Sequence, residues 1–206
     1  MTQLIIETSA GALSVALLSG AEILAEQHRI VGRGHAEHLL PAIAEVMAGQ
    51  QPPGRIAVDT GPGSFTGLRV GIAAARALGL AWRVEVVGIS ATALIAASAF
   101  AAAPHIAALG VVIDAGRGRF YVQRFDRDAG ATGAIEVLSP TEAIASLYPT
   151  RWLAGSGAAA LRSLGEFEII AAGEPRAADA RWLTEPATPA DTDPLYLGAS
   201  MPAVAA

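Results

Sequence analysis

A glycine-rich segment carries the densest set of groups that could do chemistry. The run 59–69 reads DTGPGSFTGLR and follows the short apolar stretch 55–58. A strand that passes through glycines into a helix presents free backbone N–H groups at the positive end of the helix dipole. The segment therefore predicts either an anion site or a tight structural corner, and the structural corner is the favoured interpretation.

Two known catalytic loops do not fit this segment. A Walker A loop reads G-x-x-x-x-G-K-[ST], but Gly61 and Gly67 are one residue too far apart, and the chain contains no lysine. A nucleophile elbow reads G-x-S-x-G, whereas Ser64 has Pro62 and Thr66 in place of the two glycines. The spacing therefore predicts neither a P-loop nor a serine hydrolase.

Carboxylates and histidines offer a second kind of chemistry. Glu7 and Asp114 each end an expected strand, where a carboxylate could hold a metal-bound nucleotide or cap a turn. His35 and His38 are spaced i, i+3, unlike the i, i+4 pair of zinc proteases, so we expect no metal site. The candidate anion- or nucleotide-binding residues are Thr8, Ser9, Gly61, Gly63, Ser64 and Asp114.

Composition narrows the classes of function. With 206 residues and 52% apolar side chains, the chain can bury one large core or two smaller ones. A net charge of −5 argues against strong nucleic-acid binding by this chain alone. The absence of cysteine excludes disulfides and thiolate metal sites. The best candidates for RNA or phosphate contact are Arg117, Arg119, Arg124 and Arg127.

One stretch, 86–113, carries no charged residue and is long enough to span a bilayer. Pro104 and His105 interrupt it, and its middle is mostly alanine. The pattern therefore favours a strand, a buried helix and another strand over a membrane span. The N-terminal segment shows no basic region or cleavage site, and we expect a cytoplasmic protein without membrane contact.

The elements that must position these groups recur along the chain. In the first half the pattern predicts three strands, a helix, a strand, a helix, a strand and a helix at 4–7, 13–18, 23–28, 34–47, 55–58, 67–82, 85–88 and 90–102. The second half repeats the order with strands at 109–114, 120–125, 135–138 and 151–154 and helices at 139–147 and 157–164, followed by a short helix at 176–183 and an extended loop at 186–194. This duplicated βββαβα order predicts two ribonuclease-H-like α/β lobes, 1–103 and 104–206.

Several strings, in this order, resemble the TsaB (YeaZ-like) family, which belongs to the glycoprotease-like peptidase M22 group. They are ETS at 7–9, SVAL at 14–17, HAEHLLP at 35–41, GPGSFTGLRVGI at 61–72, GIS at 88–90, IDA at 113–115 and PLYL at 194–197. The resemblance covers essentially the whole chain. It implies the duplicated two-lobe fold of the actin, hexokinase and Hsp70 (ASKHA) type.

The same resemblance implies a function. It identifies a non-catalytic scaffold and activating subunit for formation of N6-threonylcarbamoyladenosine at position 37 of tRNAs that read codons beginning with adenine. In that system the TsaD paralogue transfers the group and the TsaE ATPase joins the complex, so ATP and Mg²⁺ act at the level of the complex and this chain requires no cofactor. The chain would contact tRNA only as part of the complex. Without its partner, the chain would form a homodimer.

The resemblance also implies a partner face on the helices 34–47 and 67–82. We expect small residues there to point outward and permit close helix packing, namely Ala42, Ala44, Gly71, Ala75 and Gly79. On this view Ala75→Arg or Gly71→Arg should abolish pairing and leave the fold intact. The expected partner-binding residues are His38, Ala42, Glu45, Leu68, Gly71, Ala75 and Leu78.

Two other functions stay open. A nucleotide-dependent kinase or ATPase of the same fold would use Glu7 and Asp114, and calorimetry with ATP and Mg²⁺ would distinguish it. Proteolysis follows only from the older family label, and the sequence offers neither a zinc constellation nor a serine elbow.

Overall fold

The computed structural model describes the chain except residues 129, 172, 184–191 and 198–206. It divides into two compact units, each treated separately below. Unit 1 comprises Met1–Leu94 and Pro175–Leu195, and unit 2 comprises Ile95–Glu174 and Tyr196–Ala206. This division differs from the expected boundary at 103, because the chain returns to unit 1 after Glu174. The expected loop 186–194 lies largely outside the described residues.

Unit 1 is built on a five-stranded mixed sheet. Its strands are β1 (Thr2–Glu7), β2 (Ala12–Ser19), β3 (Glu22–Ile30), β4 (Arg55–Asp59) and β5 (Glu85–Ile89), in the order β3-β2-β1-β4-β5. The first three strands are antiparallel, and β4 and β5 run parallel to β1.

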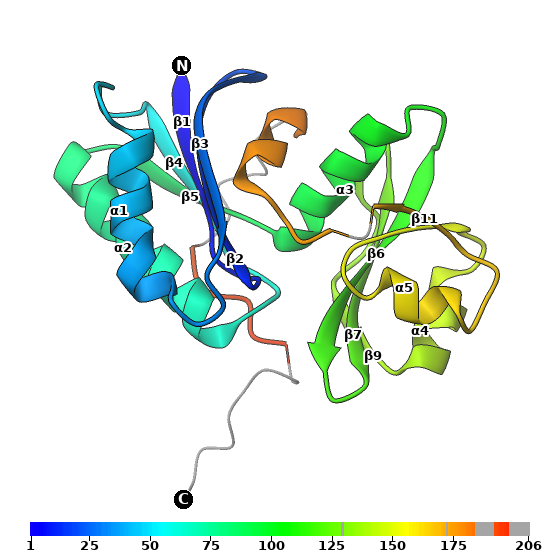
Figure 1. Cartoon of the computed structure of the whole chain (residues 1–206). Coiled ribbons are helices and arrows are strands. Elements are labelled where there is room, and N and C mark those ends of the chain that lie inside the picture. The colour runs from blue at the N-terminus through cyan, green and yellow to red at the C-terminus, as the bar shows by residue number, and fades with distance from the viewer. Residues whose placement is uncertain (129, 172, 184–191, 198–206) are drawn as a thin grey trace, which may run out of the picture. The chain divides into compact units, whose positions relative to one another are not determined.

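Helices cover the two faces of this sheet differently. Helices α1 (His35–Val46) and α2 (Phe65–Trp82) lie together on one face, and the 3₁₀-helix η1 (Ala177–Trp182) lies on the other (Figure 1). Side chains alternate along a strand, so Leu4 and Ile6 pack under α1 and α2 while Ile5 packs toward η1. Glu7 and Asp59 follow the alternation onto the η1 face.

Unit 2 repeats this plan with a six-stranded sheet whose later strands are short. It contains most of α3 (Ala91–Ala102), then β6 (Ala108–Gly116), β7 (Arg119–Asp126), β8 (Gly130–Ala131), β9 (Glu136–Leu138), α4 (Pro140–Leu147), β10 (Trp152–Ala154), α5 (Ala158–Arg162) and β11 (Glu168–Ala171). β6, β7 and β9 are antiparallel, and β10 and β11 run parallel to β6. Antiparallel strands followed by parallel β/α strands occur in both units, so the predicted duplicated ribonuclease-H-like α/β fold is confirmed.

Local details refine the predicted elements. Helix α2 begins two residues before the expected start because Ser64 caps it, its Oγ accepting the N–H of Gly67 at 3.2 Å. The capping box of Ser139 and Glu142 at the start of α4 is present as predicted. The uncharged stretch 86–113 forms strand, helix and strand. No helix among the described residues has the length and hydropathy that crossing a bilayer requires.

Candidate functional site

Two turns of unit 1 meet at the segment for which the sequence predicts either an anion site or, as the favoured interpretation, a tight structural corner. The glycine corner, residues 59–67, links β4 to α2, and the Thr8–Ser9 turn links β1 to β2. The N–H of Ser64 donates to the carbonyl of Ser9 at 2.7 Å. The hydroxyl of Thr8 donates to the carbonyl of Gly67 at 2.8 Å. The two turns are therefore bonded to each other, once through main-chain atoms and once through the Thr8 hydroxyl.

Glycines are required here because the two backbones approach so closely. A Cβ on Gly63 would lie 2.4 Å from the carbonyl oxygen of Ser9, and one on Gly67 would lie 2.0 Å from that of Thr8. Gly61 adopts a φ of 113°, which other residues rarely reach. The glycine pattern thus serves a tight contact inside unit 1.

Four N–H groups of the two turns are already bonded within the protein. Gly61 N–H donates to Asp59 Oδ1 at 2.7 Å, and Ser9 N–H donates to Glu7 Oε1 at 2.6 Å. Those of Ser64 and Gly67 are bonded as described above. Five of the six candidate anion-binding residues are therefore brought together, in a corner where the N–H groups of Ser9, Gly61 and Ser64 and the hydroxyl of Thr8 bond within the protein.

The sixth candidate, Asp114, lies in unit 2 at the place in β6 that Glu7 occupies in β1. It is exposed, and its Oδ1 accepts the N–H of Gly116 at 2.7 Å. Ser156 Oγ accepts the N–H of Asp114 at 3.2 Å. Asp114 thus caps its own turn, which was the alternative interpretation of this carboxylate.

A pair of buried carboxyl groups lies beneath the corner. Glu7 and Asp59 end neighbouring parallel strands, and neither is exposed to solvent. Burial raises the pKa of the Glu7 carboxyl well above its usual value, and repulsion from Asp59 raises it further. Burial likewise raises the pKa of Asp59 to about 6, against hydrogen bonds from Ser9, Gly61 and Glu7.

Glu7 is among the residues that the sequence singles out, but Asp59 is not predicted as its partner. A signal was available, because β1 and β4 were both expected as strands. The parallel register places Ile6 beside Val58, and the next residue of each strand is acidic. Strand order, which single-sequence periodicity does not supply, was needed to bring the two carboxyls together.

The two histidines of α1 lie in different surroundings. His35 is buried, with Nε2 at 3.3 Å from the carbonyl of Ala12, whereas His38 is exposed. Within the described part of the chain, no three His, Cys, Asp or Glu side chains gather as a metal ion would require.

The predicted partner face needs correction at several positions. His38 and Glu45 are exposed on α1, and Leu78 of α2 is half-buried. Ala44 also points outward as expected. The other small residues expected to point outward do not, so the prediction is wrong for Ala42, Gly71, Ala75 and Gly79, and the expected partner residue Leu68 is buried as well.

The inward direction of these residues follows from how closely α2 lies on its own sheet. A Cβ on Gly71 would be 2.4 Å from Thr8 Oγ1, and one on Gly79 would be 2.3 Å from Val86 Cγ2. The small residues therefore permit contact between helix and sheet. The residues that α1 and α2 expose include Ala36, Leu40, Ala44, Ala73, Arg76, Ala77 and Leu80.

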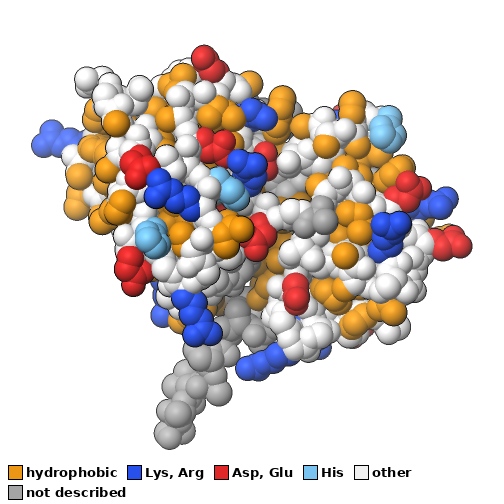
Figure 2. Space-filling model, in the orientation of Figure 1, with side chains coloured by type: hydrophobic (Ala, Val, Ile, Leu, Met, Phe, Trp, Pro, Cys, Tyr) orange, Lys and Arg blue, Asp and Glu red, His pale blue; other side chains and the backbone are white. Residues whose placement is uncertain are grey.

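The arginine cluster of the second hairpin is not a single surface. Arg127 donates to the carbonyls of Ala103 at 2.8 Å and Ile106 at 2.9 Å, and its guanidinium lies 4.7 Å from the ring centre of Phe100. Arg119 donates to the carbonyl of Val137. On the face drawn in Figure 2, blue and red side chains of the described residues are interspersed.

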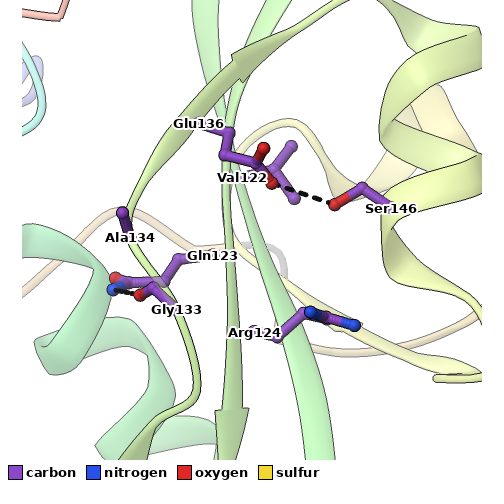
Figure 3. Close-up of a pocket in the computed structure, with 7 residues that line it drawn as sticks. All are labelled: Val122, Gln123, Arg124, Gly133, Ala134, Glu136 and Ser146. Atoms are coloured by element: carbon purple, nitrogen blue, oxygen red, sulfur yellow. Dashed lines mark hydrogen bonds between the residues drawn. The ribbon is translucent and has the colours of Figure 1, made fainter.

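Unit 2 contains a hollow of about 250 Å³ between β7, β9 and α4. Figure 3 shows its lining residues, which are Val122, Gln123, Arg124, Gly133, Ala134, Glu136 and Ser146. Ser146 Oγ donates to Glu136 Oε2 at 3.1 Å, and Gln123 Nε2 donates to the carbonyl of Gly133 at 2.8 Å. Of the residues expected to do chemistry, only Arg124 lines this hollow, and no imidazole accompanies Ser146 to activate it.

Comparisons with known proteins give a consistent result. A family model described as tRNA N6-adenosine threonylcarbamoyltransferase (TsaD) matches residues 21–170. The tRNA threonylcarbamoyladenosine biosynthesis protein TsaB of Bacillus subtilis is 31% identical over 125 residues, which cover 59% of this chain and 53% of that protein. TsaB of Haemophilus influenzae is 36% identical over 104 residues, covering 48% and 44%. The chain thus spans about half the length of the curated relatives it matches.

A solved structure extends the similarity to nearly the whole chain. YeaZ from Pseudomonas aeruginosa superposes with a TM-score of 0.78 at 26% identity, covering 95% of this chain and 99% of that one. The fold and the sequence matches agree. The chain therefore belongs to the tRNA N6-adenosine threonylcarbamoyltransferase family and is a TsaB-like member of it.

Proposed function

We propose that this protein acts in the formation of N6-threonylcarbamoyladenosine in tRNA, as a non-catalytic subunit that supports a TsaD-type transferase. Its relatives are named for biosynthesis of this nucleoside or for the transferase itself. The modified nucleoside would be at position 37 of tRNAs that read codons beginning with adenine. A TsaE-type ATPase would join the pair, and ATP and Mg²⁺ would act at the level of the complex.

One observation carries the non-catalytic part of the proposal. Several of the groups that a nucleotide-using enzyme would offer at this corner are bonded to each other. The hydroxyl and N–H of Ser9 both donate to Glu7 Oε1 at 2.6 Å, and Gly61 N–H donates to Asp59. A phosphate would have to displace these bonds and enter a contact that leaves no room for a Cβ. This geometry disfavours the kinase or ATPase alternative with Glu7.

The outer sides of α1 and α2 are the surface we assign to the partner. Leu40 is 58% exposed on α1 and Leu80 is 83% exposed on α2. Exposed alanines lie one helical turn away at Ala44 and Ala77. Apolar side chains between small residues suit helix-to-helix contact. The same surface would support a homodimer when the partner is absent.

Reconstitution tests the proposal. The chain is combined with the TsaD-type protein of the same organism, a TsaE-type ATPase, tRNA, ATP, Mg²⁺ and a threonylcarbamoyl donor, and the modified nucleoside is measured by mass spectrometry. We expect product only when both this chain and the transferase are present. Product formed by this chain without the transferase would contradict the non-catalytic role.

Two arginine substitutions test the surface. Leu40→Arg and Leu80→Arg should weaken co-purification with the transferase at least tenfold and leave the circular dichroism spectrum unchanged. Leu164→Arg, at a 59% exposed leucine of unit 2, is the matched control and should pair normally. Equal loss in all three variants would argue against a surface on α1 and α2.

A further inference from the structure

The two carboxyl groups beneath the glycine corner have a charge problem that the proposed function does not explain. Glu7 and Asp59 are both fully buried. Two neighbouring carboxylates cannot both stay ionised in such a place without a counter-charge. The molecule must therefore supply a cation or a proton at this point.

The hydrogen bonds show where it must lie. Glu7 Oε1 accepts the hydroxyl and N–H of Ser9, and Asp59 Oδ1 accepts the N–H of Gly61. The second oxygens, Glu7 Oε2 and Asp59 Oδ2, are buried and have no donor from any described residue. Each carboxyl therefore has one oxygen bonded to its own turn and one oxygen still in need of a hydrogen.

The surroundings provide no positive charge to the pair. The groups that act on the two carboxyls are the hydroxyl of Ser9, the N–H groups of Ser9, Gly61 and Ala91, and each other. The other charged or titratable residues on this face are Arg55 of β4, Glu85 of β5, Glu26 and His28 of β3, and Arg176, Asp179 and Arg181 of η1 and its start. Arg176 is paired with Glu26 and Arg55 donates to Gln3 Oε1, and none of the seven is among the groups acting on the pair.

We propose that Glu7 and Asp59 share one proton, with the Glu7 carboxyl donating to the Asp59 carboxylate, and that this bond fixes the glycine corner from which α2 begins. The bond joins the ends of β1 and β4. Glu7 holds the Ser9 turn and Asp59 holds Gly61, so the shared proton connects the two turns from below while Ser64 and Thr8 connect them from above. This bond would form in the protein without its partner and without tRNA.

A shared proton determines whether the stability of the fold rises or falls with pH. The folded pair keeps a proton that the unfolded chain releases near ordinary carboxyl pKa values, 4.5 for glutamate. The folded state therefore binds more protons than the unfolded state above that pH, and stability must fall as pH rises. The fall begins near pH 4.5 and continues through the raised pKa values of the pair.

Glu7→Gln is the informative variant. Its amide keeps an oxygen for Ser9 and offers a permanent N–H to Asp59, which replaces the shared proton. At pH 8 we expect this variant to melt at a higher temperature than the parent, by about 5 °C, and the difference should vanish near pH 5. Asp59→Asn should behave similarly. Asp114→Asn alters the exposed equivalent in unit 2 and should change neither value.

Two further measurements locate the effect. The parent should show the infrared carbonyl band of a protonated carboxyl at pH 7, and Glu7→Gln should lack it. Protection of the Gly61 N–H from hydrogen exchange should drop between pH 6 and pH 9 in the parent, about tenfold after correction for intrinsic rates. The Gly116 N–H, bonded to Asp114 Oδ1 at the same distance of 2.7 Å, is the internal control and should not change.

Three results would overturn the proposal. One is a lower melting temperature for Glu7→Gln than for the parent at pH 8. Another is absence of the protonated-carboxyl band from the parent. The third is a rise in the parent's melting temperature with Mg²⁺ or Ca²⁺ at pH 8 that Glu7→Gln lacks, since a cation would then occupy the place assigned to the proton.

Discussion

At the scale of single residues, the glycine corner can form only because its glycines have no Cβ atoms. Gly67 faces the carbonyl of Thr8, and the missing Cβ would stand 2.0 Å from that oxygen. A contact this short with main chain cannot be relieved by turning a side chain. We therefore conclude that the two turns can contact each other only because these positions are glycines.

Gly67→Ala should lower the free energy of unfolding by about 2–4 kcal/mol, because the added methyl group must push β1 and α2 apart. Gly133→Ala is the control, since a Cβ there meets nothing within 4 Å and the change should stay within about 0.5 kcal/mol. Urea unfolding measures both. A loss for Gly67→Ala no larger than that of the control would contradict the close contact.

At the scale of elements, α2 shows what periodicity can and cannot predict. The helix and its extent were predicted to within two residues at its start. Which side faces the sheet was not, because the alanines and glycines of the helix suit close contact with a sheet as well as with another helix. The sheet contact selected the side carrying Gly67, Gly71 and Gly79, whose missing side chains allow the closest approach.

Ala75→Arg should therefore damage unit 1 itself. Ala75 is fully buried in the core between α2 and the sheet, so an arginine there would cost about 4 kcal/mol or more. Ala77→Arg, two residues later and exposed, should preserve the fold. Thermal unfolding followed by circular dichroism distinguishes the two. Equal stability of both variants would mean that this side of α2 faces solvent after all.

The candidate site shows the same division at the level of strands. Short apolar runs ending in an acidic or glycine-rich turn were sufficient to predict β1, β4 and the corner. The pairing of Glu7 with Asp59 required the order β2-β1-β4, which depends on packing between distant segments. Likewise, Arg127 looked like part of a basic surface, but its partners Phe100 and Ala103 belong to α3 and the residue after it, more than twenty positions away.

Arg127→Ala should consequently act on stability. The guanidinium bonds carbonyls at the end of α3, where a helix leaves its last carbonyls without partners. It also lies over the ring of Phe100. We expect a loss of about 1–3 kcal/mol in unfolding free energy, whereas Arg117→Ala, at an exposed turn residue, should have almost none. The reverse order in chemical denaturation would contradict this role.

At the scale of the whole molecule, the chain returns to unit 1 after building unit 2. Ala177 and Ala178 pack against Ile5 and Ala16 on the sheet face opposite α1 and α2. The N–H of Ala177 donates to Ser14 Oγ at 3.0 Å. Further along, the described residues 192–195 lie against unit 1 through an ion pair of Arg76 with Asp193 and a 2.8 Å bond from Leu195 N–H to the carbonyl of Thr60. One face of the unit 1 sheet therefore depends on residues that follow unit 2 in the chain, up to 163 positions from their hydrogen-bond partner in the sheet.

A fragment of residues 1–103, the lobe expected from the sequence, should consequently fold poorly. Without the segment 175–195, the apolar side chains on the η1 face of β1, β2 and β4 are exposed to water. We expect the fragment to bind a hydrophobic dye and to unfold without a sharp transition.

A peptide of residues 175–195 added in excess should reduce dye binding and restore the transition. The same peptide with Ala177→Asp, which places a charge at a fully buried position, should do neither, because the charge would have to be desolvated. A fragment that melts cooperatively without any peptide would show that this face is stable uncovered.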